Sequence, residues 1–200
     1  MKKKIWFIRH AESAANADES VKSDDFCGWS IPLSEKGKKQ AEELLKHFEN
    51  APDLIITSPY VRTKETAKPL LNKHPHTKHE EWPIHEFTYL SGKRCFNTTF
   101  IERDPWKAEY WSNSNPKHND GEGAESFIDF MDRVRKAIEK IKRKKENFIV
   151  LFSHGYTIAA VKYILEKKPR KITSEVMRDF KKYFKANPVP NAEKFEIVIK

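Results

Sequence analysis

Residues 4–13, with the sequence KIWFIRHAES, decide the fold class, because a short apolar run there ends in a basic pair. Four consecutive apolar residues between charged ones indicate a strand buried on both faces of a sheet. Similar runs predict strands at residues 53–57, 148–152 and 194–199, and a less apolar run predicts one at 82–86. Helix-period segments separate these runs, which is typical of an α/β domain. We therefore expect a mostly parallel central sheet with helices on both faces, a three-layer αβα arrangement.

The helices follow from apolar residues spaced three or four positions apart. Ser34 can cap a helix that runs to about residue 50, and further helices are predicted over 124–144, after His154, and over 174–185. The apolar stripe of the 124–144 helix is expected to pack in the core. Residues 87–123 show no clean period, and a long irregular insertion in a compact domain is typical of a lid or binding loop. We expect residues 1–200 to form a single domain.

The charge balance favours an anionic partner, since 38 Lys and Arg oppose 29 Asp and Glu for a net charge of +9. Phosphorylated metabolites, nucleic acid and membrane surfaces all fit that sign, and much of the excess lies in solvated lysine runs. The two cysteines, Cys27 and Cys95, favour a reducing compartment, although one disulfide stays open. No apolar run is long enough for a signal peptide or a bilayer span. We expect a cytoplasmic protein that does not contact membranes.

Three basic motifs stand where predicted strands end. Arg9 and His10 follow the first strand, Arg62 lies one turn into the helix after the second, and His154 ends a later strand and opens a helix. Open α/β sheets bind ligands at the carboxyl ends of their strands, and helix N-termini attract anions. Each motif alone is more often structural, but three together predict an anion-binding catalytic site.

The ordered motifs resemble the histidine phosphatase superfamily, which includes the cofactor-dependent phosphoglycerate mutases. The resemblance covers nearly the whole chain. Its segments are residues 9–16 (RHAESAAN), 28–41 (GWSIPLSEKGKKQA), 58–67 (SPYVRTKETA), 123–134 (GAESFIDFMDRV), 153–155 (SHG) and 189–191 (VPN). The sequence departs from the pattern at Ala11, where many members have Gly, and at Ser30, where many have Asp.

The resemblance implies a role for each site residue. His10 would attack phosphorus and form a covalent phosphohistidine. Arg9 and Arg62 would clamp the phosphoryl oxygens, and His154, as a cation or a donor, would stabilise charge that grows in the transition state. The other groups expected at the phosphate are Ser13, Asn16 and Gly155. Because these groups supply the positive charge, no metal ion and no cofactor are expected.

The leaving oxygen also needs a proton. In the superfamily an acidic residue beyond the third strand gives it, and Glu86 occupies that place. A bound phosphate would raise the pKa of Glu86 and the arginines would lower it, so the net direction stays open. Glu122 is the alternative acid. Glu125 is expected near the start of the 124–144 helix, where it can also tie down a basic residue, and His85 is expected to be structural.

These residues predict a metal-independent phosphatase that hydrolyses phosphate monoesters of small metabolites. A phosphoglycerate mutase-type transferase is the alternative, although residues 87–92 (FTYLSG) lack the basic motif that follows the acid in glycolytic mutases. A protein phosphohistidine phosphatase tends to be shorter and to lack a long lid. A non-catalytic module that binds anions or nucleic acid would not need the intact set of site residues, so no nucleic-acid partner is expected. The sequence does not identify the physiological substrate, and it leaves open whether the protein forms a homodimer.

The predicted lid carries basic and aromatic residues whose roles the sequence leaves open. Its cations, which suggest a second anionic group on the substrate, are Lys93, Arg94, Arg103 and Lys107. Its larger aromatic residues are Trp106, Tyr110 and Trp111. Those rings would either contact a planar or apolar part of the substrate or pack the lid against the domain.

Overall fold

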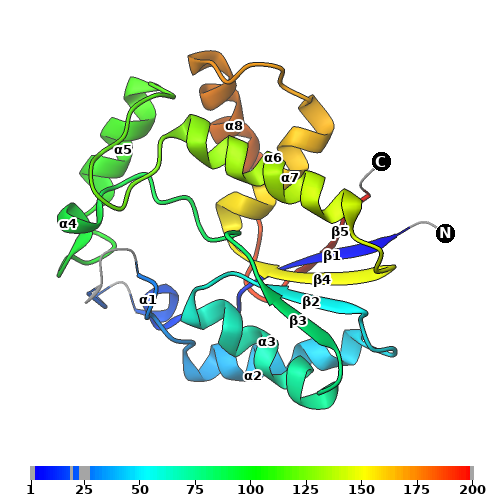
Figure 1. Ribbon diagram of the computed structural model, residues 1–200. Helices are drawn as coiled ribbons and strands as arrows, with labels where there is room; N and C mark the ends of the chain where they lie inside the picture. The colour runs from blue at the N-terminus through cyan, green and yellow to red at the C-terminus, as the bar shows by residue number, and fades with distance from the viewer. Residues whose placement is uncertain (1–2, 19, 23–27, 199–200) are drawn as a thin grey trace.

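In the computed structural model, which describes residues 3–18, 20–22 and 28–198, five strands form one sheet with the order β3-β2-β4-β1-β5 (Figure 1). The strands are β1 (Lys4–Arg9), β2 (Leu54–Thr57), β3 (Lys78–Glu81), β4 (Phe148–Ser153) and β5 (Lys194–Glu196). The first four run parallel, and β5 pairs antiparallel with β1. The prediction of a mostly parallel sheet is confirmed.

Helices cover both faces of the sheet (Figure 1). One face carries α2 (Glu35–Glu43) and α3 (Val61–Lys73), and the other carries α6 (Phe127–Arg143), α7 (Gly155–Lys167) and α8 (Ser174–Ala186). The strand residues alternate between the two layers, as the two-residue period of a strand requires. In β1, Ile5 and Phe7 join the cluster under α6–α8, whereas Trp6 and Ile8 join the cluster over α3 and the residues that follow α2. The three-layer prediction is therefore confirmed.

Two predicted strands differ from the structure in their bounds. The third strand is β3 at Lys78–Glu81, not residues 82–86, because pairing with β2 at the sheet edge needs backbone hydrogen bonds and not apolar side chains. Trp82 and Ile84 are buried, as their apolar character suggested, but they lie in an irregular segment after the strand. The last strand ends at Glu196 and not at residue 199.

The helix bounds also need correction. The helix predicted to reach residue 50 ends at Glu43 and continues as one 3₁₀ turn, η1 (Leu44–His47). The helix predicted from residue 124 begins at Phe127, because the Ser126 hydroxyl caps it by accepting a bond from the Asp129 N–H at 3.2 Å.

The insertion at 87–123 is more regular than predicted. It contains α4 (Gly92–Cys95) and α5 (Asp104–Asn113), and Figure 1 shows both beside the sheet rather than on either face. The aromatic residues of α5 face different surroundings: Tyr110 is buried in the core, and Trp106 lies under the Arg94 guanidinium. The helix therefore has no single apolar stripe, so its sequence shows no helical period.

The sequence also led to expectations about membrane spans and about the two cysteines. Among the described helices, none combines the length and the apolar character that crossing a membrane requires. Cys95 is a buried free thiol. Cys27 lies outside the described residues, so the alternative of one disulfide is not tested.

Candidate active site

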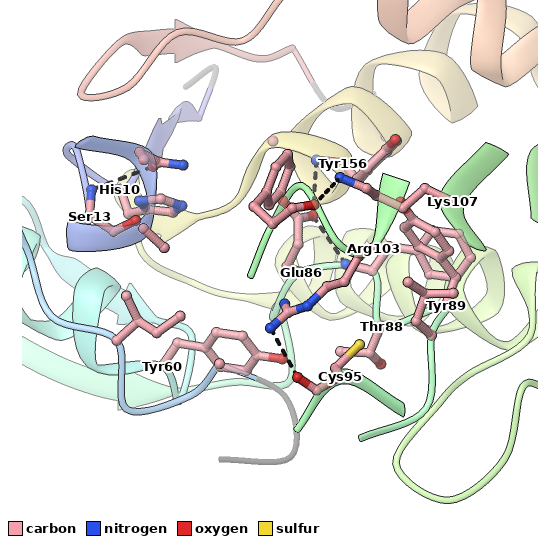
Figure 2. A pocket seen from close by; sticks show the side chains of 18 of the residues that line it. His10, Ser13, Tyr60, Glu86, Thr88, Tyr89, Cys95, Arg103, Lys107 and Tyr156 are labelled. Atoms are coloured by element: carbon pink, nitrogen blue, oxygen red, sulfur yellow. Dashed lines mark hydrogen bonds between the residues drawn. The ribbon is translucent and has the colours of Figure 1, made fainter. Parts of the chain in front are cut away.

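A cavity of about 560 Å³ lies where the parallel strands end. The residues that follow β1 line one side of it, and residues of the insertion and of α8 line the other. Figure 2 shows His10 and Ser13 on the first side and Arg103, Lys107 and Tyr156 on the second. The predicted site residues in the cavity wall are Arg9, His10, Ser13, Asn16, Arg62, Glu86 and Gly155. His154 is fully buried and does not line the cavity, although it contacts Arg62, which does.

His10 is buried at the end of β1 with its ring in one defined orientation. Nδ1 lies 2.7 Å from the carbonyl oxygen of Ala11, which can only accept, so Nδ1 carries the proton. The other ring nitrogen, Nε2, then holds a lone pair, which accepts a bond from Arg62 Nε at 3.2 Å. Burial, with help from Arg62 and Arg9, holds the pKa of His10 well below its usual range. A neutral imidazole with an unprotonated Nε2 is the form of histidine that can act as a nucleophile.

The backbone around His10 is fixed by segments that are distant in sequence. The Ala11 N–H donates to the Thr66 hydroxyl at 3.0 Å, and the Asn191 amide donates to the His10 carbonyl at 2.9 Å. Arg9 reaches the same C-terminal segment, since its Nη1 donates to the Val189 carbonyl at 2.6 Å. The residues before β5 thus hold the loop after β1 in place.

Arg62 lies between the two histidines. Its Nη1 donates to the Gly28 carbonyl at 2.6 Å, and its Nη2 lies 3.3 Å from Nδ1 of His154. A guanidinium has no acceptor atoms, so Nδ1 of His154 accepts this contact. His154 has no exposed surface, and burial lowers its pKa far below the usual value, with Arg62 adding to the shift. His154 is therefore neutral in this structure. Of the two predicted forms of His154, a cation and a neutral donor, the structure has the neutral donor.

Glu86 lies in the loop after β3, at the predicted place. Its Oε1 accepts the backbone N–H groups of Phe87 and Tyr156, both at 3.0 Å, the second from the first turn of α7. Burial raises the pKa of Glu86, and this effect exceeds the opposite influence of those bonds and of Arg9 and Arg62. A carboxyl group with a raised pKa is suited to proton transfer near neutral pH.

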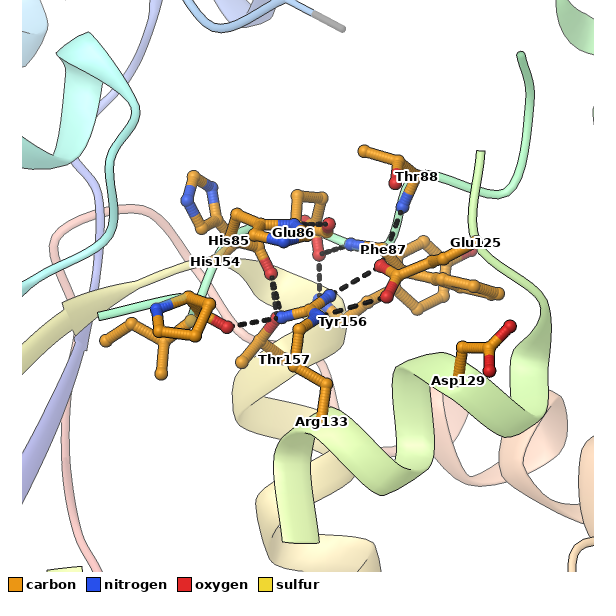
Figure 3. Close-up of polar contacts among 12 residues, drawn as sticks. His85, Glu86, Phe87, Thr88, Glu125, Asp129, Arg133, His154, Tyr156 and Thr157 are labelled. Carbon is orange, nitrogen blue, oxygen red and sulfur yellow. Dashed lines mark hydrogen bonds and ion pairs between the residues drawn. The ribbon is translucent and has the colours of Figure 1, made fainter. Parts of the chain in front are cut away.

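Arg133 of α6 organises the loop that carries Glu86 (Figure 3). Its Nη1 donates to the carbonyls of Pro83 and His85, at 2.9 and 3.1 Å, and its Nη2 pairs with Glu125 Oε1 at 2.5 Å. Glu125 also accepts the Thr88 N–H at 3.3 Å. Glu125 thus ties down a basic residue as expected, but it precedes the helix instead of lying in its first turn. The His85 carbonyl also accepts from Thr157, which agrees with a structural role for His85.

The expected phosphate-binding groups also lie at the cavity. Ser13 caps the short helix α1 (Ala14–Ala17), and the Asn16 side-chain oxygen accepts a contact from Asn191 at 3.3 Å, which leaves the Asn16 amide N–H groups as donors. Gly155 opens α7, and a side chain there would contact Glu86 Oε2 at 3.6 Å and Arg9 Nε at 3.7 Å. Gly155 therefore lies between these two groups, and a Cβ there would meet both at ordinary contact distance.

The lid residues divide between the cavity and the lid's own packing. Arg103 and Lys107 line the cavity, whereas Lys93 is exposed and Arg94 pairs with Asp120 at 2.9 Å. Tyr110 and Trp111 pack against the hydrophobic core, which favours the packing alternative for these rings. The alternative acid, Glu122, is exposed and does not line the cavity.

Several residues of the site were not singled out from the sequence. Ser58, which lies within a quoted motif, contacts His154 Nε2 at 2.8 Å. Tyr156 supplies an N–H to Glu86, and Lys181 of α8 lines the cavity from the far end of the chain. Ser58 could have been found from its motif, but Lys181 is one lysine in a basic amphipathic helix and carries no sequence signal. Among the described residues, no cluster of three or more His, Cys, Asp or Glu side chains is placed to hold a metal ion.

The fold and the site define a class of protein: an αβα domain with two buried histidines and two arginines at the carboxyl edge of its sheet. The sequence matches the family described as the histidine phosphatase superfamily (branch 1) over residues 5–179. The chain therefore belongs to the histidine phosphatase superfamily. Among curated proteins, no sequence matches it.

Solved structures of phosphatases share the fold at low sequence identity. The α-ribazole phosphatase of Shigella flexneri is 22% identical, with a TM-score of 0.65 over 87% of this chain and 83% of that one. A mycobacterial glucosyl-3-phosphoglycerate phosphatase is 19% identical, with a TM-score of 0.70 over 97% and 89%. A mutant phosphoserine phosphatase from Entamoeba histolytica, in complex with phosphoserine, is 19% identical, with a TM-score of 0.68 over 96% and 88%. At these identities the likeness shows the fold.

Proposed function

We propose that this protein is a phosphatase that hydrolyses phosphate monoesters of small molecules through a phosphohistidine at His10, without a metal ion or a dissociable cofactor. The observation that carries this proposal is the Nδ1–H bond from His10 to the Ala11 carbonyl, because it leaves Nε2 as a lone pair at the cavity. Two cysteines in 200 residues favour the reducing cytosol as the place of action.

In the first step, Nε2 of His10 attacks phosphorus and the bond to the ester oxygen breaks. Arg62 Nε, which donates a hydrogen bond to Nε2 in the structure, donates to a phosphoryl oxygen instead. Arg9 and the Asn16 amide bind the other phosphoryl oxygens. His154 stays neutral, because burial holds its pKa far below the usual value, and its Nδ1 accepts from Arg62 Nη2 and so orients the guanidinium that binds the phosphoryl group. Glu86, whose pKa is raised by burial, gives its proton to the leaving alkoxide.

In the second step, water attacks the phosphohistidine. The Glu86 carboxylate takes a proton from this water, the bond between phosphorus and Nε2 breaks, and inorganic phosphate leaves with His10 neutral again. The cations at the site are Arg9 and Arg62, so the charge of the phosphoryl group can be balanced without a metal ion. Asn16, Ser13 and the helix N-terminus at Gly155 add donors around the same oxygens.

Hydrolysis is preferred here over a phosphoglycerate mutase reaction because residues 87–92 lack the basic motif that follows the acid in glycolytic mutases. A non-catalytic anion or nucleic-acid module would gain nothing from a histidine held as the Nδ1–H tautomer. A protein phosphohistidine phosphatase is the less favoured alternative, since an insertion with two helices borders the cavity.

Trapping the phosphoenzyme tests this proposal. Wild-type protein mixed with ³²P-labelled monoester and quenched in milliseconds should carry acid-labile, base-stable label that maps to His10. His10→Ala should carry no label and turn over no substrate while its circular dichroism is unchanged, and the exposed control His76→Ala should behave as wild type. Substantial turnover in His10→Ala would overturn the assignment.

A further inference from the structure

Lys181, on α8, is a cavity-lining cation whose charge no carboxylate of the described residues neutralises at ion-pair distance. Its Nζ donates to the Tyr156 hydroxyl at 2.9 Å and lies 4.4 Å from the centre of the Trp111 ring. The side chain is partly buried among rings that cannot balance its full charge. A partly buried cation without an anionic partner is unusual, and its place in a cavity points to a ligand.

The neighbouring lid cations are already engaged within the lid. Lys107 forms an ion pair with Asp104 and donates to the Phe100 carbonyl at 3.0 Å. Arg103 donates to the carbonyls of Cys95 and Thr98 through Nη2, at 3.1 and 2.6 Å. The charge of Lys107 is therefore paired with Asp104, and Arg103 is fixed within the lid by carbonyl and hydroxyl oxygens.

Tyr156 joins Lys181 to the proposed phosphate site. Its backbone N–H binds Glu86, its hydroxyl binds Lys181, and its ring stacks on Phe184 with centroids 4.1 Å apart. Tyr156 therefore contacts Glu86 with its backbone and Lys181 with the far end of its side chain. His10 and Lys181 line the same cavity, so a substrate whose phosphate lies at His10 can direct another group toward Lys181.

We propose that Lys181 and the Tyr156 hydroxyl form a second subsite that binds a carboxylate of the substrate, so that the preferred substrates are phosphate monoesters of small carboxylic acids. This inference rests on the proposed phosphatase function and adds a substrate class to it. The subsite offers one charge, which suits a monoanionic carboxylate, whereas a second phosphate would require more cations. One carboxylate oxygen would accept from Nζ and the other from the Tyr156 O–H.

The protonation states of both groups support this arrangement. Burial, with Lys185 and Lys107 nearby, lowers the pKa of Lys181 to about 8, so the ammonium still predominates at neutral pH and an anion would favour it further. Burial raises the pKa of the Tyr156 phenol well above its usual value, which keeps that hydroxyl protonated. Both groups thus keep their protons under working conditions, and the Tyr156 hydroxyl would exchange its bond with Tyr89 for one with the carboxylate.

Kinetics with a matched substrate pair test the subsite. 3-Phosphoglycerate and glycerol 1-phosphate share a carbon skeleton, and only the first has a carboxylate in place of a hydroxymethyl group. Wild type should show a kcat/KM at least ~10-fold higher for 3-phosphoglycerate, a difference typical of one charge-assisted contact. Lys181→Met should abolish that preference by raising KM for 3-phosphoglycerate alone. Lys181→Arg should restore most of it, and Lys182→Met, an exposed neighbour, should leave it unchanged.

The outcomes separate this inference from the proposed function. If wild type hydrolyses both esters and p-nitrophenyl phosphate with no preference, or if Lys181→Met keeps the preference, the subsite is refuted while the phosphatase function stands. If no ester is hydrolysed, the proposed function fails. In that case, calorimetric titration with the same two compounds tests whether the subsite exists. Weaker binding of 3-phosphoglycerate to Lys181→Met than to wild type supports the subsite, and equal binding refutes it.

Discussion

The hydroxyl of Ser58 lies 2.8 Å from Nε2 of His154, and neither side chain has any exposed surface. Arg62 donates to the other ring nitrogen, so Nε2 carries the proton and donates to Ser58. The hydroxyl therefore selects the tautomer and orientation of a ring that lies beside His10, with the ring centroids 5.1 Å apart. Ser58 is a positioning residue, since it acts on the reaction through His154.

Ser58→Ala should lower kcat by roughly 10-fold and change KM less, because the ring of His154 loses the bond that orients it. The free energy of unfolding should fall by about 1–2 kcal/mol, since a buried N–H is left without its acceptor. Thr57→Val is the matched control: this buried hydroxyl contacts His79 Nε2 at 3.0 Å, away from the cavity. Steady-state kinetics and urea denaturation should show a stability loss in both variants but a loss of kcat in Ser58→Ala alone.

The stability of the fold should decrease as the pH falls below about 6.5, the ordinary pKa of histidine. Burial depresses the pKa of His10 and of His154 in the folded state, so the unfolded chain takes up protons there before the folded chain does. Each group then lowers the free energy of unfolding by up to ~1.4 kcal/mol per pH unit until its folded pKa is reached. The raised pKa of Glu86 acts in the opposite direction, because its stabilising contribution is lost as the pH rises.

Urea denaturation between about pH 7.5 and 5.5 measures this slope. His10→Asn should reduce the slope by up to ~1.4 kcal/mol per unit, since the variant lacks one of the depressed groups. Replacing the exposed His76 by Asn provides the comparison and should keep the slope of the wild type. An unchanged slope in His10→Asn would mean that His10 is not held neutral by the fold.

The sequence predicts the site better than it predicts the elements that surround it. Arg9, His10, Arg62 and His154 follow buried apolar runs, and the parallel sheet brings the ends of those runs together. Neither Lys181 nor the bond from Ser58 to His154 could be predicted, because both depend on contacts between distant segments. Helical periodicity likewise fails for α5, whose aromatic residues face both the core and the lid's own cations.

Removal of metal ions should leave the activity intact. The proposed mechanism balances the phosphoryl charge with Arg9 and Arg62, and no carboxylate or thiolate cluster is placed for a metal among the described residues. Turnover of p-nitrophenyl phosphate should be equal before and after exhaustive dialysis against EDTA, and Mg²⁺ or Mn²⁺ should not increase it. Loss of turnover that Mg²⁺ restores would contradict the mechanism.

Glu86→Gln should impair substrates with poor leaving groups far more than substrates with good ones. An aliphatic phosphate ester releases a strongly basic alkoxide, which needs the Glu86 proton. The p-nitrophenolate ion is weakly basic and leaves without that proton. General acid catalysis is worth ~10²–10⁴-fold, so kcat should fall by that factor for glycerol 1-phosphate and by little for p-nitrophenyl phosphate. The amide oxygen of Gln can still accept the N–H groups of Phe87 and Tyr156, so the loop keeps its bonds.

The control for Glu86 is Glu122→Gln, which changes an exposed carboxylate that does not line the cavity. It should leave both substrates unaffected. A structural defect in Glu86→Gln would slow the two substrates alike, because the arginine clamp and His10 serve both. Equal losses for both esters, or a leaving-group-dependent loss in Glu122→Gln instead, would therefore remove Glu86 from the role of proton donor. A selective loss in Glu86→Gln alone assigns proton transfer to Oε2, since Oε1 is held by two backbone N–H groups in the structure.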